Sequence, residues 1–425
     1  MADVEHIFNG RVAVIGLGYI GLPTAACLAI RGVEVIGVDV NEATVKSVAN
    51  GEVPFIEPDL AAAVSGAVAL GRLTASTEVP EADAYIIAVP TPFLDDENGD
   101  HRADLRYVRA ATESIAPKLR GGEVVILEST SPPGTTHGIS AWLADLRPDL
   151  VLPHASEGVP DVYVAHCPER VLPGRIMVEM ITNDRVVGGI TPRCTARAAS
   201  IYRVFCHGEI VTSDAAAAEM AKLVENAYRD VNIAFANELS LISEDLEIDV
   251  WEVIRLANHH PRVNVLTPGP GVGGHCIAVD PWFIVGADPD GARLIRTARH
   301  VNDDKPRHVA AQVAHKTERF RSPTVACLGL AYKANIDDLR ESPAIDIVRA
   351  IAEDQPDLDI RVAEPHIHVL PEALTGYANV RLEPACDAIA AADIVVLLVD
   401  HDHFRSLSRS RLAGKVVYDT RGLWR

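Results

Sequence analysis

Short apolar runs alternate with longer segments of helical composition over the first half of the chain. Apolar runs cover residues 11–16, 33–38, 84–89 and 124–127, and segments of helical composition cover residues 20–31, 42–50 and 104–119. Strands that alternate with helices are typical of a parallel sheet with helices on both of its faces. We therefore predict a doubly wound α/β domain over residues 1–205.

The pattern changes near residue 212, where helical composition begins and continues to about Glu247. Thr212, Ser213 and Asp214 precede this segment, and residues of these types commonly cap a helix N-terminus. Further helices are expected at residues 250–258 and 291–316. We predict a central helical domain over residues 206–315. A helical segment between two α/β parts favours a subunit interface, and hence a homodimer.

The α/β alternation returns after Pro323. Strands are expected at residues 324–328, 359–363, 394–399 and 416–418, with a helix at residues 343–353. This third domain, residues 316–425, has no GxGxxG sequence, so it repeats the architecture without the dinucleotide-binding pattern. The predicted fold class is α/β, with two Rossmann-like doubly wound domains joined by a central segment built on a long helix.

Composition and charge narrow the class of protein. The 425 residues are 48% hydrophobic and 23% charged, which is typical of a folded chain with more than one domain. The net charge of −20 is spread along the chain, which argues against a nucleic-acid partner because phosphate backbones need a concentrated basic face. We expect no membrane span and no signal peptide. Seven scattered cysteines without a CxxC pair are typical of reduced cytoplasmic thiols rather than of disulfides or a metal site.

Residues 16–21, Gly-Leu-Gly-Tyr-Ile-Gly, lie between a predicted strand and a predicted helix. In this pattern Gly16 allows a tight turn, Gly18 lets the backbone approach a pyrophosphate, and Gly21 allows close packing of helix and strand. The helix N-terminus offers N–H groups to the phosphates. Asp39 ends the next strand, where its carboxylate can bind ribose hydroxyls and repel a 2′-phosphate. The predicted cofactor is therefore NAD, and a glycine turn without a ligand is the weaker alternative.

Cys276 follows a run in which residues 268–275 contain four glycines and two prolines. Such a loop lets the backbone lie close to a ligand and delivers one thiol, with Asp280 four residues later. A thiol beside backbone N–H groups and cations tends toward the nucleophilic thiolate. The alternative is a buried structural cysteine, but a glycine-rich loop is costly in chain entropy and rarely serves packing alone. Cys276 is therefore the candidate nucleophile.

Lys222, Asn226 and Arg229 are spaced four and three residues apart on the long predicted helix, so they share one face. A solvent-exposed face is the alternative, and the spacing alone favours it. Two polar segments, residues 128–132 and residues 167–170, follow predicted strands of the first domain. Ligands of open α/β sheets bind at such strand ends, although each segment is ambiguous by itself.

Six segments resemble the UDP-glucose/GDP-mannose dehydrogenase family and occur in the family's order, so the resemblance covers essentially the whole chain. They are GLGYIGLP (16–23), LESTSPPG (127–134), CPERVLPG (167–174), EMAKLVENAYRDVNIAFANE (219–238), PGPGVGGHCIAVDPWF (268–283) and AYKANIDDLRESP (331–343). The resemblance implies an NAD-dependent enzyme that removes two hydrides from C6 of a UDP-sugar. The alcohol becomes an aldehyde, Cys276 captures it as a thiohemiacetal, and oxidation to a thioester precedes hydrolysis to the acid.

The resemblance also implies roles for further residues. Lys222 would stabilise developing negative charge and take part in proton transfer, with Asn226 as its hydrogen-bonding neighbour. Asp280 and Thr130 would hold or activate water, and Glu169 would assist thioester hydrolysis. The positions that match substrate contacts are Arg170, Val171, Lys222, Asn226, Arg229, His260, Arg262, Gly273, Tyr332 and Lys333. The positions that match NAD contacts are Gly16, Gly18, Tyr19, Ile20, Gly21, Asp39, Thr91, Thr130 and Arg340.

His275 stands where the UDP-glucose enzymes of the family generally have a small residue. With the loop of His275, CPERVLPG (167–174) and HPRVN (260–264) most resemble the members of the family that act on UDP-N-acetyl-D-mannosamine. The resemblance implies this sugar nucleotide as the substrate and a uronate for surface polysaccharide as the product. A UDP-glucose 6-dehydrogenase is the alternative within the family. An ordinary two-electron hydroxyacid dehydrogenase would not need Cys276 or the third domain. A non-catalytic nucleotide sensor would be expected to have lost Cys276, Lys222 or Asp280, and all three are present.

Overall fold

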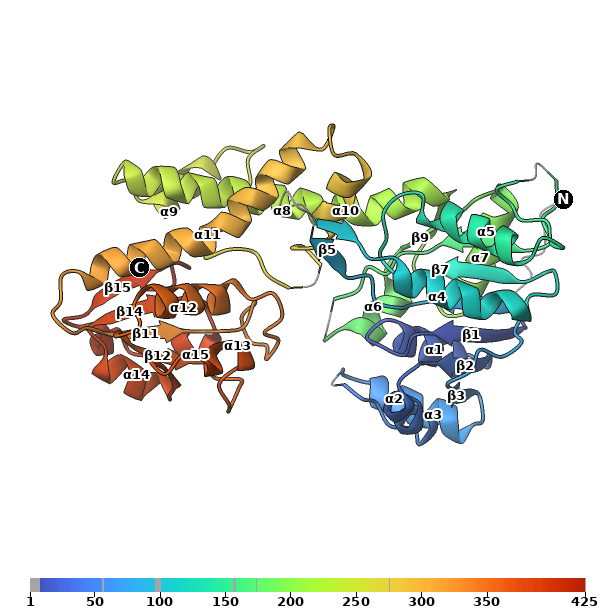
Figure 1. Cartoon of the computed structure of the whole chain (residues 1–425), viewed down its shortest axis with the longest axis horizontal. Coiled ribbons are helices and arrows are strands. Elements are labelled where there is room, and N and C mark those ends of the chain that lie inside the picture. Colours follow the sequence, from blue (N-terminus) through green and yellow to red (C-terminus); the bar gives the residue numbers. More distant parts are fainter. Residues whose placement is uncertain are drawn as a thin grey trace. The chain divides into compact units, whose positions relative to one another are not determined.

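The structure is a computed structural model that describes residues 8–55, 57–95, 101–155, 158–172, 174–274 and 276–424. The chain forms two compact units, Met1–Val224 and Glu225–Arg425. Each unit contains a sheet rich in parallel strands with helices around it (Figure 1), which confirms the predicted fold class. The long helix α8 (Ala215–Asp245) crosses the boundary between the units. The limits of the three predicted domains stay a prediction.

Eight strands form the sheet of the first unit, in the order β10-β9-β8-β7-β4-β1-β2-β3. Their bounds are β1 (Arg11–Ile15), β2 (Glu34–Val38), β3 (Leu73–Ser76), β4 (Ala84–Ile87), β7 (Val124–Leu127), β8 (Tyr163–His166), β9 (Arg185–Gly189) and β10 (Ile210–Asp214). The strands from β3 to β8 are parallel, whereas β9 pairs antiparallel with β8 and parallel with β10. The prediction of a parallel sheet was therefore wrong between β8 and β9. The short helix α6 (Ile176–Thr182) packs against α1 (Gly21–Ile30) and does not carry the chain back across the sheet.

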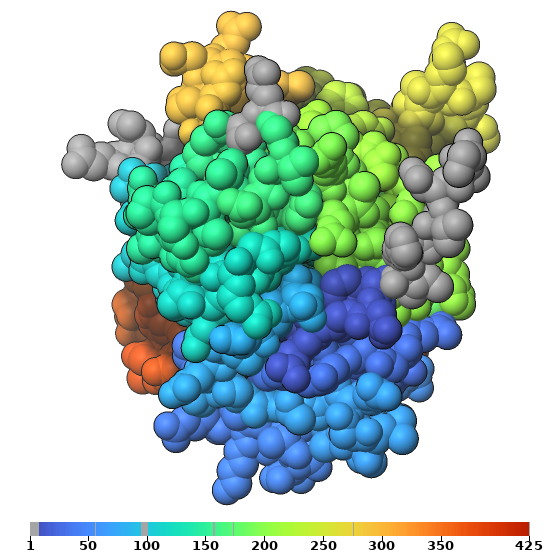
Figure 2. All heavy atoms as spheres, turned by 90° about the vertical axis from the view of Figure 1, so that its right-hand side faces the viewer, coloured from blue at the N-terminus to red at the C-terminus, as the bar shows by residue number. Residues whose placement is uncertain are grey.

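Helices cover both faces of this sheet. The core on one face joins the strands to α1, α2 (Glu42–Ala49), α3 (Leu60–Ala69), α6 and α7 (Pro192–Tyr202), and the core on the other joins them to α4 (Arg106–Ile115) and α5 (Thr135–Leu146). Val12 and Val14 of β1 belong to the first core, and Ala13 and Ile15 belong to the second. This alternation is expected for a strand buried on both faces. Figure 2 shows the surface of this unit, with N-terminal segments in blue and segments that come after β7 in green.

A small hairpin and the start of α8 complete the first unit. The hairpin consists of β5 (Phe93–Asp95) and β6 (His101–Ala103), which pair antiparallel. Helix α8 follows β10 directly, and the Asp214 carboxylate accepts a hydrogen bond from the backbone N–H of Ala217 at 2.9 Å. Asp214, the last residue of β10, therefore caps the helix, as its residue type predicts, whereas Thr212 and Ser213 lie earlier in the strand.

The second unit continues from α8 through α9 (Val250–Ala257), α10 (Asp280–Ala287) and α11 (Arg293–Thr317). A buried polar seam joins α8 and α11. Arg299 Nη1 donates to Asp230 Oδ1 at 2.5 Å, and Asn302 Nδ2 donates to the same oxygen at 2.8 Å. Asn237 donates to Asn302 at 2.9 Å and accepts from the backbone N–H of Gly269 at 2.9 Å. The seam therefore extends into the glycine-rich loop and fixes where that loop begins.

The C-terminal sheet of the second unit is parallel throughout, in the order β13-β12-β11-β14-β15. Its strands are β11 (Thr324–Leu328), β12 (Asp359–Ala363), β13 (Val380–Leu382), β14 (Ile394–Leu397) and β15 (Val416–Asp419). Helices α11, α12 (Pro343–Asp354) and α13 (Glu372–Thr375) pack on one face, and α14 (Ala385–Ala391) and α15 (Asp402–Arg405) pack on the other. Within the described part of the chain, no helix has the length and apolar character of a membrane span.

Candidate active site

The turn between β1 and α1 is closely packed at two glycines and open at a third. Gly16 has a φ of +98°, and a Cβ there would lie 2.4 Å from the carbonyl oxygen of Ala88. A Cβ at Gly21 would lie 1.9 Å from the carbonyl oxygen of Gly16, so only glycine lets α1 begin this close to β1. A Cβ at Gly18 would meet nothing within 4 Å. This open side lies at the N-terminus of α1, where backbone N–H groups and the helix dipole favour a phosphate.

Asp39 follows β2 beside this turn. Its Oδ2 accepts a hydrogen bond from the backbone N–H of Leu17 at 2.9 Å, and its Oδ1 accepts from Asn41 at 2.9 Å. The half-buried carboxylate retains capacity for further hydrogen bonds. Tyr19 and Ile20 lie in the turn, and the Tyr19 side chain is 41% exposed. These residues fit the ribose and pyrophosphate of NAD.

The ends of β4 and β7 are joined by a hydrogen bond from Thr91 Oγ1 to the carbonyl oxygen of Thr130 at 2.7 Å. Both residues lie at the carboxyl edge of the sheet, as the sequence predicts for Thr130. Beyond them, Gly134 and Thr136 at the start of α5 donate backbone hydrogen bonds to the buried Glu219 carboxylate at 2.6 and 2.7 Å. Glu219 belongs to α8, so these contacts anchor the start of α8 beside this edge.

Glu169 belongs to a buried cluster of charges at the same edge. Arg185 Nη2 donates to Glu169 Oε2 at 2.8 Å, and Arg185 Nη1 lies 3.7 Å from Glu128 Oε1. Glu128 also accepts hydrogen bonds from Thr24 at 2.9 Å and from Tyr202 at 3.2 Å. Burial raises the pKa of Glu128 to about 8, although the Arg185 cation acts to lower it. One guanidinium therefore faces two carboxylates, and Arg185 holds Glu169 in place.

Cys276 lies on the turn before α10 and is the one exposed thiol among the seven cysteines, all of which are described. Its carbonyl oxygen accepts a hydrogen bond from the backbone N–H of Asp280 at 2.8 Å. Asp280 is buried in the first turn of α10, and its Oδ2 accepts from Asn226 Nδ2 of α8 at 2.5 Å. Burial raises the pKa to about 12 for three of the other cysteines, Cys27, Cys167 and Cys327. Two further predicted site residues, Asp280 and Asn226, are therefore connected to the turn that carries the one exposed thiol.

The glycine-rich loop before Cys276 packs against the turn that follows β11. Gly274 has a φ of +84°, and a Cβ there would lie 2.8 Å from the ring of Tyr332. A Cβ at Gly273 would lie 2.9 Å from the Cβ of Tyr332. Burial raises the pKa of Tyr332, and the negative charges of Asp338 and of a Cys276 thiolate add to this effect. The loop and the Tyr332 ring are thus in contact, and the thiol lies close enough to affect the phenol.

The remaining predicted residues of the central segment lie on α8 and in the turn after α9. Lys222 is half-buried one helical turn before Asn226, and Arg229 is exposed on the same helix. His260 and Arg262 are exposed in the turn after α9, where the backbone N–H of Arg262 donates to His260 Nδ1 at 3.3 Å. The structure describes no contact that joins these two side chains to Cys276.

Five further residues complete the set. Arg170 is half-buried and donates its backbone N–H to the adjacent glutamate at 2.7 Å, and Val171 packs against the first core of its unit. Lys333 is exposed, two residues after the buried Ala331. Arg340 is exposed and donates to the Asp338 carboxylate at 2.6 Å. His275 lies outside the described residues.

Two structural features near the site were not predicted from the sequence. They are the Arg185 guanidinium behind Glu169 and the seam of Asp230 and Arg299 that leads to the glycine-rich loop. A signal for Arg185 existed, because it opens the apolar strand β9 and a buried charge must be paired. Asp230 and Arg299 lie on helices of mixed composition, where charges usually face solvent.

Three family models match successive parts of the chain. The NAD binding domain of the UDP-glucose/GDP-mannose dehydrogenase family matches residues 10–206, its central domain matches residues 216–304, and its UDP binding domain matches residues 326–425. The first match covers the Gly16 turn and Asp39, the second covers Lys222 and Cys276, and the third covers Tyr332.

Similar proteins extend over nearly the whole chain. An NDP-N-acetyl-D-galactosaminuronic acid dehydrogenase of Ralstonia solanacearum is 55% identical over 97% of this chain and 96% of its own. A UDP-N-acetyl-D-mannosamine dehydrogenase of Escherichia coli is 54% identical over 97% of this chain and 99% of its own. A solved UDP-D-ManNAc dehydrogenase of Pyrococcus horikoshii is 35% identical, with a TM-score of 0.84 over 98% of this chain and 96% of its own. The chain is therefore an NAD-dependent oxidoreductase and belongs to the UDP-glucose/GDP-mannose dehydrogenase family.

Proposed function

We propose that the protein oxidises C6 of UDP-N-acetyl-D-mannosamine to a carboxylate, with NAD, through covalent intermediates on Cys276. The observation that carries the proposal is an exposed thiol on the turn whose Asp280 carboxylate is hydrogen-bonded to Asn226. A nucleophile beside oriented polar groups is what covalent capture of a reactive aldehyde requires. A dehydrogenase that removes only one hydride has no need of such a thiol.

The turn after β1 is proposed to hold NAD, which accepts hydride from the sugar carbon when bound. Gly18 and the N-terminus of α1 would take the pyrophosphate, and Asp39 would orient a ribose and disfavour a 2′-phosphate. The further proposed contacts are Gly16, Tyr19, Ile20, Gly21, Thr91, Thr130 and Arg340.

Cys276 is proposed to bond to the sugar carbon once the first oxidation has produced the aldehyde. The sulfur adds to the carbonyl carbon, and the negative charge that develops on oxygen is stabilised by Lys222 and Asn226. The hydrogen bond from Asn226 to Asp280 orients the amide and leaves its second N–H available to donate to this oxygen. Loss of a second hydride from this thiohemiacetal leaves a thioester on Cys276.

Hydrolysis releases the acid and restores the thiol. Water adds to the thioester carbon, the carbon–sulfur bond breaks, and Cys276 leaves as the thiolate. Asp280 and Thr130 are proposed to hold or activate this water, with Glu169 as the carboxylate that assists hydrolysis. The ion pair with Arg185 at 2.8 Å fixes the orientation of Glu169.

The sugar is proposed from the relatives and from the loop sequence. The Escherichia coli relative at 54% identity is a UDP-N-acetyl-D-mannosamine dehydrogenase, and His275 distinguishes the loop from those of the UDP-glucose enzymes. The Ralstonia relative at 55% identity is an NDP-N-acetyl-D-galactosaminuronic acid dehydrogenase. The UDP derivative of N-acetylgalactosamine is therefore a second substrate to test. The proposed substrate contacts are Arg170, Val171, Lys222, Asn226, Arg229, His260, Arg262, Gly273, Tyr332 and Lys333.

Substrate turnover by the purified protein tests the proposed sugar. NADH formation is measured with NAD and, separately, the UDP derivatives of N-acetylmannosamine, N-acetylgalactosamine and glucose. We expect the highest kcat/KM with UDP-N-acetyl-D-mannosamine. A higher kcat/KM with either of the other two nucleotides would contradict the proposed sugar and leave the mechanism standing.

The Cys276→Ser variant tests the covalent mechanism. We expect acid formation to fall by roughly 10³-fold or more, because removal of a catalytic nucleophile has effects of this size. NAD affinity should be unchanged. Cys386→Ser, which alters the one half-buried cysteine, is the matched control and should keep full activity. Normal acid formation by Cys276→Ser would rule out the covalent intermediate.

We also propose that the protein is a homodimer that works in the cytoplasm and supplies a uronate for surface polysaccharide. Support for the dimer comes from α8, where Tyr228 is 72% exposed, Phe235 is 52% exposed and Ile242 is 48% exposed. These residues repeat every seven positions and therefore lie on one side of the helix. Exposed aromatic and aliphatic side chains in a row are typical of a protein interface.

A further inference from the structure

The turn after β11, residues 329–335, repeats the backbone geometry of the glycine turn after β1. Gly329 has a φ of +95° and Gly16 has a φ of +98°. In each turn the residue after the glycine donates its backbone N–H to an acidic side chain that follows the next strand. Asp39 accepts this hydrogen bond at 2.9 Å, and Glu364 accepts it at 2.7 Å. The third domain therefore keeps the shape of the turn without the GxGxxG sequence.

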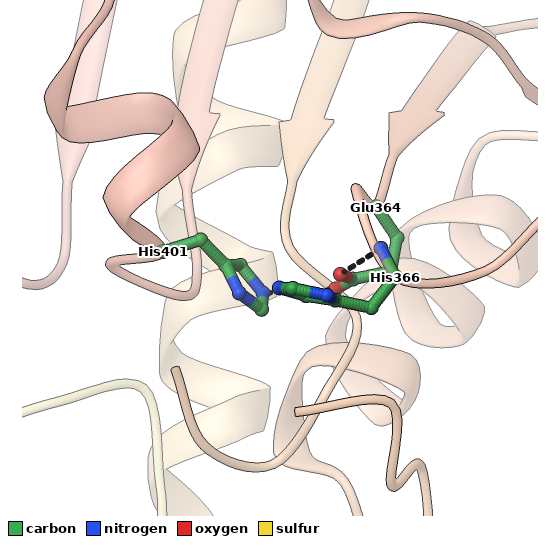
Figure 3. Close-up of side chains that lie close together, drawn as sticks. All are labelled: Glu364, His366 and His401. Atoms are coloured by element: carbon green, nitrogen blue, oxygen red, sulfur yellow. Dashed lines mark hydrogen bonds and ion pairs between the residues drawn. The ribbon is translucent and has the colours of Figure 1, made fainter. Parts of the chain in front are cut away.

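Glu364 is buried together with His401, which lies after β14. His401 Nε2 is 3.0 Å from Glu364 Oε2, and both side chains have an exposed fraction of 0%. His401 Nδ1 accepts a hydrogen bond from the backbone N–H of Asn335 at 3.0 Å. Figure 3 shows these side chains and His366 directed toward one another. The histidine thus connects the acid at the end of β12 to the far end of the turn.

These contacts fix the tautomer of His401. An Nδ1 that accepts from a backbone N–H carries no proton, so the proton of the neutral ring is on Nε2 and is donated to Glu364. Potential ligand atoms of Glu364, His366 and His401 lie within 4.8 Å of one another, which raises the alternative of a metal site. A metal would need the Nε2 lone pair that this tautomer lacks. Hydrogen bonding therefore explains the cluster better than metal binding.

Every contact described for the Glu364 carboxylate uses it as an acceptor. Oε2 accepts from the backbone N–H of Leu330 at 2.7 Å, from that of Ala331 at 3.1 Å and from His401. Oε1 accepts from the backbone N–H of His366 at 3.1 Å. Burial acts to raise the pKa of Glu364, but the hydrogen bonds from His401 and Leu330 outweigh it and lower the pKa. In a glutamine at this position, the NH2 group would face an N–H donor in either orientation of the amide, because both oxygens of Glu364 accept hydrogen bonds.

The turn is therefore held at both ends. Glu364 binds its first residues, and His401 and Asp402 bind Asn335 at its last. Asn335 has a φ of +63°, and its side chain and Asp402 exchange hydrogen bonds at 2.9 and 3.0 Å. Between these anchors lie Tyr332, which packs against the loop of Cys276, and the exposed Lys333.

We propose that Glu364 and His401 are positioning residues that hold Tyr332 and Lys333 in the conformation that binds the nucleotide diphosphate of the substrate. This inference rests on the proposed function, which includes Tyr332 and Lys333 among the substrate contacts; both lie in the part of the chain that matches the family's UDP binding domain. We call Glu364 and His401, with their hydrogen bonds to the turn, the relay. Neither residue takes part in the reaction itself. The relay gives the turn fixed, buried hydrogen bonds in place of hydrogen bonds to solvent. The turn is therefore ordered before the nucleotide binds, and the entropy cost of binding is smaller.

Steady-state kinetics of His401→Phe and Glu364→Gln test the relay. Phenylalanine keeps the ring volume and removes the acceptor for Asn335 and the donor to Glu364. We expect KM for the sugar nucleotide to rise roughly ten-fold, the factor that corresponds to about 1.4 kcal/mol, while KM for NAD stays unchanged. His401→Asn, which can place an amide oxygen near the Nδ1 position, should recover part of the loss. The control is His366→Ala, which removes the exposed neighbour and should leave both KM values unchanged.

Two further measurements separate this inference from the proposed function. The ¹⁵N shifts of His401 should report a neutral ring protonated at Nε2 whether or not a UDP-sugar is oxidised. Calorimetric binding of UDP alone should weaken in His401→Phe by a factor similar to the change in KM. A wild-type enzyme that oxidises no UDP-sugar but binds UDP, with weaker UDP binding in His401→Phe, would refute the proposed function only.

The relay would be overturned if both variants kept KM for the sugar nucleotide within about two-fold of wild type. An equal rise in KM for NAD would also overturn it, since that would indicate a general loss of structure. Added Zn²⁺ that bound stoichiometrically and required Glu364, His366 and His401 would replace the relay by a metal site.

Discussion

Replacement of the buried Arg185 by methionine should destabilise the first unit in a way that depends on pH. Arg185 is 5% exposed, pairs with Glu169 at 2.8 Å and lies 3.7 Å from Glu128. Its guanidinium also lies over the rings of Tyr202 and Phe205, 5.0 and 5.2 Å from their centroids. Methionine keeps most of the apolar volume, so the cavity contribution is small. The main effect is the loss of the only cation described between the two carboxylates.

The magnitude follows from the burial of the charges that remain. Breaking a buried ion pair by removing one partner costs about 3–5 kcal/mol, because the other charge stays buried and uncompensated. This full loss is expected near pH 9, where Glu128 is ionised. At pH 6 Glu128 is protonated, because burial raises its pKa to about 8. The loss for Arg185→Met should then be smaller than at pH 9, because only the Glu169 carboxylate loses its cation.

The sign of the pH dependence in the unaltered protein follows from the same group. The folded state binds a proton at Glu128 up to about pH 8, whereas an unfolded glutamate releases it near pH 4.3. Stability should therefore fall as pH rises through this window, with a slope of at most about 1.4 kcal/mol per pH unit from this group. Glu128→Gln should remove that part of the slope.

Hydrogen exchange measures the opening free energy of each unit separately. Peptides that cover β8 and β9 report the first unit, and peptides that cover β11 and β12 serve as an internal control. Arg11→Met is the matched variant, because Arg11 forms an exposed ion pair with Glu34 in the same sheet, and it should lose less than about 1 kcal/mol. Equal losses for Arg11→Met and Arg185→Met, or a loss that is the same at pH 6 and pH 9, would refute the reasoning.

Three further substitutions test the cofactor site, the chemistry and the interface. Asp39→Ala should raise KM for NAD roughly ten-fold by loss of a ribose contact and improve the use of NADP, whereas Glu42→Ala on the neighbouring helix should do neither; an unchanged preference for NAD would contradict the role of Asp39. Asp280→Asn should lower kcat about 10²-fold or more with little change in the KM for the sugar, and stopped-flow kinetics that show normal turnover would remove Asp280 from the chemistry. Tyr228→Asp should halve the mass seen by light scattering, whereas Tyr107→Asp on α4 should not, and a dimer that survives Tyr228→Asp and Phe235→Asp together would place the interface elsewhere.

Much of the fold could be predicted because the signals for it are local. Strands buried on both faces are near-continuous apolar runs, and glycines at fixed offsets report a backbone that no other residue can adopt. Gly16 and Gly21 show this directly, since a Cβ at either would overlap a backbone atom. The edge of the first sheet was not predictable in this way, because the direction of β9 depends on how α6 packs against α1.

The candidate site was predictable as a set of residues and not as a set of contacts. Asn226 and Asp280 are 54 residues apart, and their hydrogen bond depends on how α10 docks against α8. Arg185 and Arg299 resemble ordinary surface charges in the sequence, and only tertiary packing buries them against carboxylates. His401 likewise gave no signal, because its partners come from two other strand ends.

The amount of NADH formed for each sugar nucleotide consumed is the most direct measurement of the proposed chemistry. With purified enzyme, excess NAD and limiting UDP-N-acetyl-D-mannosamine, capture of the aldehyde by Cys276 predicts two NADH per sugar, an acid as product and no aldehyde in solution. A single NADH per sugar, with an aldehyde that can be trapped from solution, would contradict it.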